Sequence, residues 1–185
     1  MSLASATSPI GGILARAPVI PVLTIARLED AVPLARALTS GGLGVLEVTM
    51  RSPAALAAIT RIKAELPWAI VGAGTVLTSA DIAAAEQAGA DFLVSPGSTP
   101  DLIRAAKGQV LPFLPGAATA SEAMNLLENG FCYQKFFPAG FSGGSAALKA
   151  LHAPLAGIVF CPTGGITAAN APAYDDADGR KQQLN

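Results

Sequence analysis

The chain has 185 residues and a formal net charge of −1, and it is 51% hydrophobic but only 14% charged. At about 150 residues per domain this length fits one domain, and the apolar, weakly charged composition excludes a disordered chain. The charge balance also argues against a nucleic-acid partner, which would favour a basic face. These counts predict a single globular domain.

The apolar stretches are interrupted in ways that exclude membrane insertion and export. The longest uncharged run, residues 150–174, could cross a bilayer by length, but it contains three prolines and three glycines. The N-terminus lacks a basic start followed by an unbroken apolar stretch. Cys132 and Cys161 are isolated, which predicts two buried free thiols in a reducing cytoplasm. One histidine and two distant cysteines make no ordinary transition-metal site, so we expect no metal.

Seven short apolar runs recur at regular intervals, and each interval contains one helical pattern. The runs begin near Val19, Val45, Ile70, Phe92, Val110, Tyr133 and Ile158. Strands that alternate with helices in this way predict βαβ units and a parallel sheet. A short N-terminal helix is expected before the first strand.

The residues between the runs mark helix boundaries. A serine or threonine precedes proline at 52–53 and 99–100, which predicts N-caps with proline at the first helical position. Threonine is followed three residues later by an acid at 78–81 and 119–122, which is the spacing of a capping box. Glycines stand where helices are expected to end: Gly41, Gly42, Gly89 and Gly130.

The second run, residues 45–51, alternates between apolar and polar side chains. An open sheet covered by helices on both faces would have uniformly apolar strands. A closed barrel has an inner face that becomes polar toward the C-terminal ends of its strands, where the active site lies. The alternation places Glu47, Thr49 and Arg51 on this inner face. The predicted fold is therefore α/β, a TIM (β/α)8-type barrel.

Lys135 is embedded in the sixth run, between Gln134 and Phe136. A lysine in such an apolar strand is costly unless it is paired or neutral. Loss of hydration favours the neutral amine, which is the nucleophilic form. Two interpretations are open at this point: Lys135 and Glu47 form either a catalytic pair or a structural ion pair inside the barrel. Arg51 alone could be a surface charge at a strand end.

The other strand ends are rich in glycine and proline. Gly164 and Gly165 follow the seventh strand, where glycines let backbone N–H groups approach an anion. The loops after strands seven and eight are the usual phosphate site of a TIM barrel. A dinucleotide site at Gly72 and Gly74 is excluded, because Leu77 occupies the position of the third glycine.

Six segments together resemble the 2-dehydro-3-deoxy-phosphogluconate aldolase family. They occur in the family's order and spacing, and the similarity runs from about residue 19 to residue 170. The segments are VLEVTMR (45–51), GAGTVL (72–77), SPG (95–97), LPG (114–116), KFFPA (135–139) and FCPTGGI (160–166). The resemblance implies a class I aldolase on a TIM barrel that cleaves a phosphorylated 2-keto-3-deoxy sugar acid to pyruvate and glyceraldehyde 3-phosphate. It further implies a cytoplasmic homotrimer that needs no cofactor.

The resemblance also assigns roles to individual residues. Lys135 would form the Schiff base with the keto carbon, and Glu47 would shuttle protons for carbinolamine formation and C–C cleavage. Arg51 and Thr75 would hold the pyruvate carboxylate. Two further residues would wall the pocket and three would contribute to its phosphate end: Phe137 and Pro96 for the wall, and Thr163, Gly164 and Gly165 for the phosphate. An iminium withdraws electrons from the neighbouring C–C bond, so a lysine can replace a metal as the electron sink.

The C-terminal residues depart from the family pattern. The family continues with an eighth strand whose loop grips the phosphate, whereas residues 174–185 are polar and contain no β-branched residue. We therefore expect no barrel strand there. The expected organisation is a barrel domain over residues 1–173, truncated after its seventh strand and helix, and a non-matching polar tail over 174–185. Strands one and seven would then face a gap, and phosphate binding would be weakened.

Two alternatives to the aldolase stay open. The chain could be a non-catalytic barrel remnant or assembly scaffold, which would fold and assemble without cleaving a substrate. It could also be another phosphate-binding TIM-barrel enzyme, of the thiamine-phosphate-synthase or isomerase kind, although such enzymes do not need a buried lysine in KFFPA. For an aldolase, the sugar acid could be the gluconate or the galactonate epimer.

Overall fold

The computed structural model describes residues 8–178 and 182–184 of the chain. In this part of the chain, parallel strands alternate with helices. The strands are β1 (Val19–Leu23), β2 (Val45–Thr49), β3 (Ile70–Gly74), β4 (Phe92–Val94), β5 (Phe113–Leu114), β6 (Gly116–Ala117), β7 (Tyr133–Phe136), β8 (Val159–Pro162) and β9 (Gln182–Leu184). The helices are α1 (Pro9–Leu14), α2 (Ala31–Ser40), α3 (Ala55–Glu65), α4 (Ser79–Gln87), α5 (Pro100–Lys107), α6 (Ala120–Glu128), α7 (Gly144–His152) and α8 (Ala171–Asp178), with a 3-10 turn, η1 (Leu28–Asp30), before α2.

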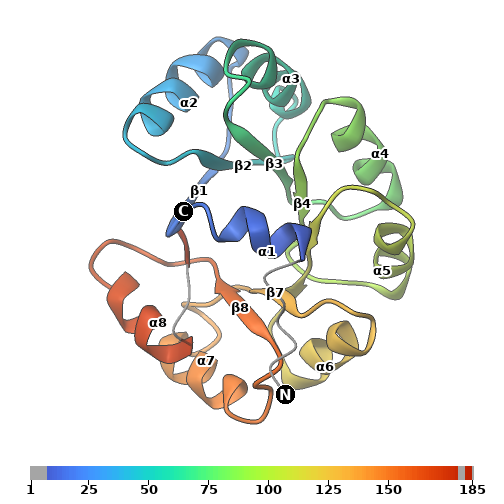
Figure 1. Cartoon of the computed structure of the whole chain (residues 1–185), viewed down its shortest axis with the longest axis vertical. Helices are drawn as coiled ribbons and strands as arrows, with labels where there is room; N and C mark the ends of the chain where they lie inside the picture. Colours follow the sequence, from blue (N-terminus) through green and yellow to red (C-terminus); the bar gives the residue numbers. More distant parts are fainter. Residues whose placement is uncertain (1–7, 179–181, 185) are drawn as a thin grey trace.

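The strands form two parallel sheets that together surround the centre of the molecule. One sheet has the order β5-β4-β3-β2-β1-β9 and the other the order β6-β7-β8. Helices α2 to α8 lie outside the strands, and α1 lies across the middle of the ring in the view of Figure 1. This is the arrangement of a TIM-type barrel, as the alternation of strands and helices predicted.

A single proline separates the two sheets. β5 pairs with β4 and β6 pairs with β7, and Pro115 lies between β5 and β6. Proline has no N–H to donate to a ladder, but its carbonyl remains available. The Pro115 carbonyl accepts a hydrogen bond from the Lys135 N–H at 2.8 Å, which joins the end of one sheet to β7 of the other.

Two layers of apolar side chains hold the barrel together. On the outside, Leu46 and Val48 of β2 pack with residues of α2 and α3, such as Ala35 and Ile59. Inside, α1 fills the end of the barrel where the strands begin. We call the buried cluster there the inner apolar layer: Ile10, Leu14, Ala17, Ile20, Val45, Phe92, Val94, Leu114, Tyr133 and Cys161. The alternation predicted for β2 is thus confirmed, with Val45 and Glu47 on the inner face.

Most of the predicted helix boundaries are confirmed. Complete capping boxes begin α4 and α6, and the Thr99 hydroxyl accepts from the Leu102 N–H at the start of α5. The predicted glycine stops are also in place. Gly42, Gly89 and Gly130 have φ angles of 91°, 83° and 92°, a left-handed conformation that glycine adopts without a steric penalty.

Three expectations were wrong. The fifth strand begins at Phe113 rather than near Val110, which is 91% exposed in the loop before it. The hydroxyl of Ser52 does not cap α3, which begins at Ala55; it donates instead to the Ile25 carbonyl. Cys161 is buried as expected, but Cys132 is only half-buried.

The C-terminal residues also differ from the expectation. We expected no strand in 174–185 and a gap beside the first strand, but β9 pairs in parallel with β1, placing Gln182 beside Val19 and Leu184 beside Pro21. Helix α8 continues to Asp178, and Tyr174 is buried in the core. A parallel ladder uses backbone N–H and C=O groups, which every residue except proline supplies, so low β-propensity did not prevent pairing with an open strand edge.

Candidate active site

Glu47 and Lys135 meet inside the barrel. Glu47 is the middle residue of β2 and Lys135 belongs to β7, so they come from different sheets. The Lys135 Nζ atom lies 3.4 Å from Glu47 Oε1, and the two side chains are 6% and 1% exposed. Each lies two residues beyond a member of the inner apolar layer, Val45 on β2 and Tyr133 on β7. The predicted pairing of the two residues is therefore present in the structure.

Two glycines of β3 provide the space for this arrangement. A Cβ atom on Gly74 would overlap Glu47 Oε1, and a Cβ atom on Gly72 would overlap the ring of Phe92. The inner face of β3 therefore carries no side chain at these two positions. The Glu47 carboxylate occupies one of the spaces and the Phe92 ring occupies the other.

One oxygen of Glu47 is left without a partner. Oε1 contacts Lys135, whereas Oε2 is buried and has no hydrogen-bond partner among the described residues. A buried carboxylate oxygen normally has one, because leaving it unpaired costs free energy. Such an oxygen is available to accept a proton from a bound molecule or to donate one to it.

Arg51 and Thr75 lie where β2 and β3 end. Thr49 pairs with Gly74 in the ladder, and the Met50 N–H donates to the Gly74 carbonyl at 2.8 Å, so the two chain segments leave the barrel side by side. Arg51 is exposed, and its Nη2 donates to Thr24 Oγ1 at 3.1 Å. Arg51 thus lies beyond Glu47, at the end of the barrel where the strands end, which we call the open end.

Thr75 has an unusual backbone conformation. Its φ angle is 61°, in the left-handed region, and it is the one described residue other than glycine with a positive φ. For an ordinary residue this conformation costs about 1–2 kcal/mol. Strain of this kind persists only where the surroundings enforce it, and such positions cluster at functional sites.

Phe137 and the loop after β8 lie on the other side of the pair. The Lys135 Nζ atom is 5.3 Å from the centre of the Phe137 ring. A Cβ atom on Gly164 would lie 3.2 Å from that ring, and Gly164 and Gly165 have φ angles of 92° and 78°. Neither glycine N–H donates to a backbone carbonyl within the described chain. Thr163 is buried, and its carbonyl accepts from the Ala139 N–H at 2.7 Å.

Pro96 lies against Gly116, which is the ladder partner of Lys135. A Cβ atom on Gly116 would overlap the Pro96 carbonyl, and Gly116 pairs with Lys135 in the ladder between β6 and β7. The loop after β4 therefore packs closely against the strand that neighbours Lys135. The buried Ser95 hydroxyl supports this packing by accepting from the Gly116 N–H.

The nine predicted site residues thus lie in two groups that Glu47 and Lys135 connect. Glu47, Arg51 and Thr75 are on β2, β3 and their ends. The other group belongs to β7, β8 and the packed β4 loop: Lys135, Phe137, Thr163, Gly164, Gly165 and Pro96. Sequence reasoning gave no role to Gly74, although a glycine inside a strand signals close approach by a neighbouring group. It also gave no role to Thr24, the polar residue that follows β1.

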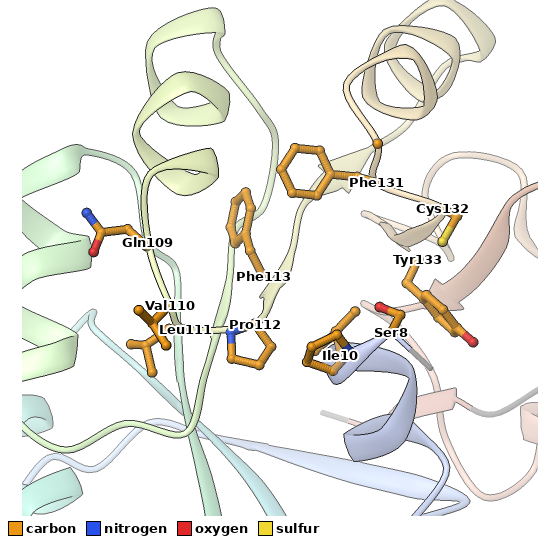
Figure 2. A pocket seen from close by; sticks show the side chains of 12 residues that line it. Ser8, Ile10, Gln109, Val110, Leu111, Pro112, Phe113, Phe131, Cys132 and Tyr133 are labelled. Carbon is orange, nitrogen blue, oxygen red and sulfur yellow. The ribbon is translucent and has the colours of Figure 1, made fainter. Parts of the chain in front are cut away.

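A separate cavity of about 250 Å³ lies at the opposite end of the barrel. Figure 2 shows it between α1, the loop before β5 and the start of β7, with Phe113, Phe131, Cys132 and Tyr133 along its wall. Its residues precede the strands or, like Phe113 and Tyr133, begin them, whereas Arg51, Thr75 and Gly164 follow the strands. The cavity is therefore not part of the candidate active site.

Two kinds of feature are absent from the described residues. No group of three or more histidine, cysteine, aspartate or glutamate side chains in this part of the chain could hold a metal ion. None of its helices is both long and apolar enough to cross a membrane.

Solved structures of two aldolases share this fold. The KDPG aldolase of Legionella pneumophila, solved with pyruvate captured at low pH as a covalent carbinolamine intermediate, matches with a TM-score of 0.90 and 41% identity, covering 97% of this chain and 87% of that one. The 2-keto-3-deoxy-6-phosphogluconate aldolase of Zymomonas mobilis, solved with 3-phosphoglycerate, matches with a TM-score of 0.86 and 49% identity over 89% of this chain and 78% of that one. The fold is thus that of the aldolase barrels, which are lyases.

Sequence comparison identifies the family. The KHG/KDPG aldolase of Escherichia coli K12 is 48% identical over 162 residues, which cover 88% of this chain and 76% of the relative. The family model for KDPG and KHG aldolases matches residues 10–179, well beyond the expected limit at residue 170. The chain therefore belongs to the KDPG and KHG aldolase family.

Proposed function

We propose that this chain is a class I aldolase that cleaves 2-dehydro-3-deoxy-6-phosphogluconate to pyruvate and glyceraldehyde 3-phosphate, with Lys135 as the Schiff-base residue. One observation carries the assignment of the site: a nearly buried lysine lies 3.4 Å from a buried carboxylate inside the barrel. The family membership supports the substrate, because close relatives are named for this reaction. The family membership favours neither a scaffold nor a different barrel enzyme.

The reaction begins at Lys135. The lone pair of the neutral amine attacks the keto carbon, and the carbonyl oxygen becomes the hydroxyl of a carbinolamine. Glu47 lies within reach of Nζ, so it takes the proton that the amine loses and passes it to the carbonyl oxygen, which becomes the carbinolamine hydroxyl. Glu47 then takes up a second proton from solvent and donates it to this hydroxyl, which leaves as water. An iminium remains on Lys135.

Cleavage uses the same two residues. Glu47 removes the proton from the hydroxyl beyond the scissile bond, and the C–C bond breaks with its electron pair moving into the iminium. Glyceraldehyde 3-phosphate leaves and an enamine remains. Protonation of the enamine carbon and hydrolysis release pyruvate. The unpartnered Oε2 of Glu47 supports this role, since it is free to exchange protons with the bound sugar acid.

The remaining residues bind and orient the substrate. Arg51 and Thr75 hold the pyruvate carboxylate, for which a guanidinium provides paired donors. Phe137 and Pro96 form walls of the pocket. Gly164 and Gly165 bind the phosphate through backbone N–H groups that donate to no backbone carbonyl in the described chain. Thr163, whose own N–H donates to the Phe136 carbonyl at 2.9 Å, contributes to this end of the pocket by fixing the start of the loop beside β7.

We also infer that the protein acts in the cytoplasm as a homotrimer and binds no nucleic acid or membrane. Support comes from the family resemblance, the net charge of −1 and the two free cysteines. Large exposed apolar side chains at Trp68, Leu77 and Phe141 are available for contact between subunits. Sedimentation should give a mass three times the 18.5 kDa of one chain, and a monomer would contradict the trimer.

The test of the activity is release of pyruvate from the phosphorylated gluconate acid, with the galactonate epimer assayed in parallel. The parent protein should turn over at least one epimer. Lys135→Met keeps the length of the side chain but removes the amine, so kcat should fall by at least about a thousandfold. Equal turnover by the variant, or no turnover by the folded parent, would overturn the proposal.

A further inference from the structure

Three hydrogen bonds connect Arg51 to the backbone of β1. Arg51 Nη2 donates to Thr24 Oγ1 at 3.1 Å. Thr24 Oγ1 lies 3.0 Å from Thr49 Oγ1, and Thr49 Oγ1 donates to the Leu23 carbonyl at 3.1 Å. The last residue of β2 and the residue after β1 therefore form a continuous chain of polar groups that ends at the guanidinium.

The direction of each hydrogen bond follows from the available protons. Arginine can only donate, so Thr24 accepts from Arg51. A hydroxyl has one proton, and Thr49 uses its proton on the Leu23 carbonyl, so Thr49 must accept from Thr24. Each hydroxyl thus accepts one hydrogen bond and donates one. Hydrogen bonds that run in one direction in this way strengthen one another.

The anchor of this chain is rigid. Leu23 pairs with Val48 in the ladder between β1 and β2, adjacent strands in Figure 1, and Thr49 is 2% exposed. Thr24 and Arg51, by contrast, are exposed at the open end of the barrel. An exposed arginine otherwise samples many rotamers, and fixing it costs conformational entropy.

We propose that Thr24 is a positioning residue that holds the Arg51 guanidinium ready for the substrate carboxylate. The inference rests on the proposed function, in which Arg51 binds the pyruvate carboxylate. Thr24 uses one of the five guanidinium N–H donors, which leaves an edge free for a bidentate contact with a carboxylate. The alignment exists before the substrate arrives, so the cost of ordering Arg51 does not fall on binding.

The test compares Thr24→Val, which removes the hydroxyl but keeps the shape, with Thr24→Ser, which keeps the hydroxyl. The measurement is the pyruvate concentration at which borohydride trapping on Lys135 is half-maximal. Thr24→Val should raise this concentration by about three- to tenfold, while the maximal extent of trapping is retained. Thr24→Ser should stay within about twofold of the parent.

Acetone provides the readout that separates positioning from general damage. It forms a Schiff base but has no carboxylate, so Thr24→Val and the parent should be trapped equally by it. In an Arg51→Met background, Thr24→Val should have no further effect on pyruvate. Unchanged pyruvate dependence in Thr24→Val, or an equal loss with acetone, would overturn the role of Thr24. Absence of any adduct in the parent would overturn the proposed function itself, and this inference with it.

Discussion

The two ends of the barrel use the same strands for different purposes. Where the strands begin, α1 and the inner apolar layer fill the interior with Ile10, Leu14 and Phe92. Two residues further along β2 and β7, the inner face carries Glu47 and Lys135. Two residues correspond to about 6.6 Å along a strand. The change from a packed core to a reactive site is therefore abrupt.

The packed end determines what the other end can do. The inner apolar layer excludes water from beneath the Glu47–Lys135 pair, and a low dielectric strengthens charge interactions within the site. It also disfavours any ion that is left without a partner. Changes at the open end should therefore affect catalysis first, whereas changes at the α1 end should affect stability first.

Apart from the loss of Lys135, Glu47→Gln should show the largest effect on kcat at the open end. The amide keeps the shape of the side chain but cannot exchange protons as a carboxylate does, so kcat should fall by about 10²- to 10⁴-fold. Steady-state cleavage kinetics measure this. The matched control is Glu122→Gln, the same change on the exposed first turn of α6. Equal losses in the two variants would contradict a special role for Glu47.

Gly74→Ala should have the next largest effect on kcat. The new methyl group would overlap Glu47 Oε1 and push the carboxylate away from Lys135. A misplacement of about 1 Å can cost about a hundredfold in rate, and we expect a loss in kcat of this order. Gly44→Ala is the control, because no atom lies within 4 Å of its added Cβ. If Gly74→Ala retained full kcat, the close approach of Gly74 to Glu47 would have no catalytic importance.

At the opposite end, Gly11→Ala should reduce stability and leave kcat/KM unchanged. Its Cβ would lie 2.6 Å from the Tyr133 ring, in a packed interior. Overpacking of this kind lowers the free energy of unfolding by about 1–3 kcal/mol, which urea denaturation can measure. Gly12→Ala in the same helix has open space and should be neutral or slightly stabilising. A loss of kcat/KM in folded Gly11→Ala would contradict the expectation that changes at the α1 end affect stability and not catalysis.

The smallest expected effect concerns pH. Hydrogen bonds from the Ala118 N–H, with those from Thr119, hold the pKa of Glu122 below its ordinary value. A lowered pKa means that the ionised carboxylate stabilises the folded state above about pH 4.3, and that this contribution is lost as the pH falls through the folded-state pKa. Glu122→Gln should therefore be less stable than the parent by under about 1 kcal/mol at neutral pH. The two unfolding free energies should converge in acid, and a constant difference at all pH values would contradict this.

Local patterns in the sequence predicted much of the fold. The capping boxes of α4 and α6 depend on residues three apart, and the alternation in β2 depends on a repeat of two, so both can be recognised in one chain. The pairing of strands is different, because it depends on which strand edge in the folded chain still has no neighbouring strand. The pairing of β9 with β1 contradicted the expectation for that reason.

The candidate site shows the same difference between local sequence patterns and contacts between distant residues. Lys135 and Glu47 stand out in sequence because each is a charge in an apolar strand. The roles of Gly74 and Thr24 depend on contacts with residues elsewhere in the chain, Glu47 and Arg51. Glycines mark many turns and strands, and a threonine after a strand is common, so neither signal could name its partner without coordinates.

Schiff-base formation on Lys135 is tested most directly by borohydride reduction in the presence of pyruvate, followed by peptide mass mapping. We predict a reduced pyruvate adduct on Lys135 and none on Lys63, whose amine is paired with Asp91 at 2.7 Å. Lys135→Met should remain folded and form no adduct. A folded parent protein that gives no adduct, or one whose adduct lies on another lysine, would contradict the role of Lys135 as the Schiff-base residue.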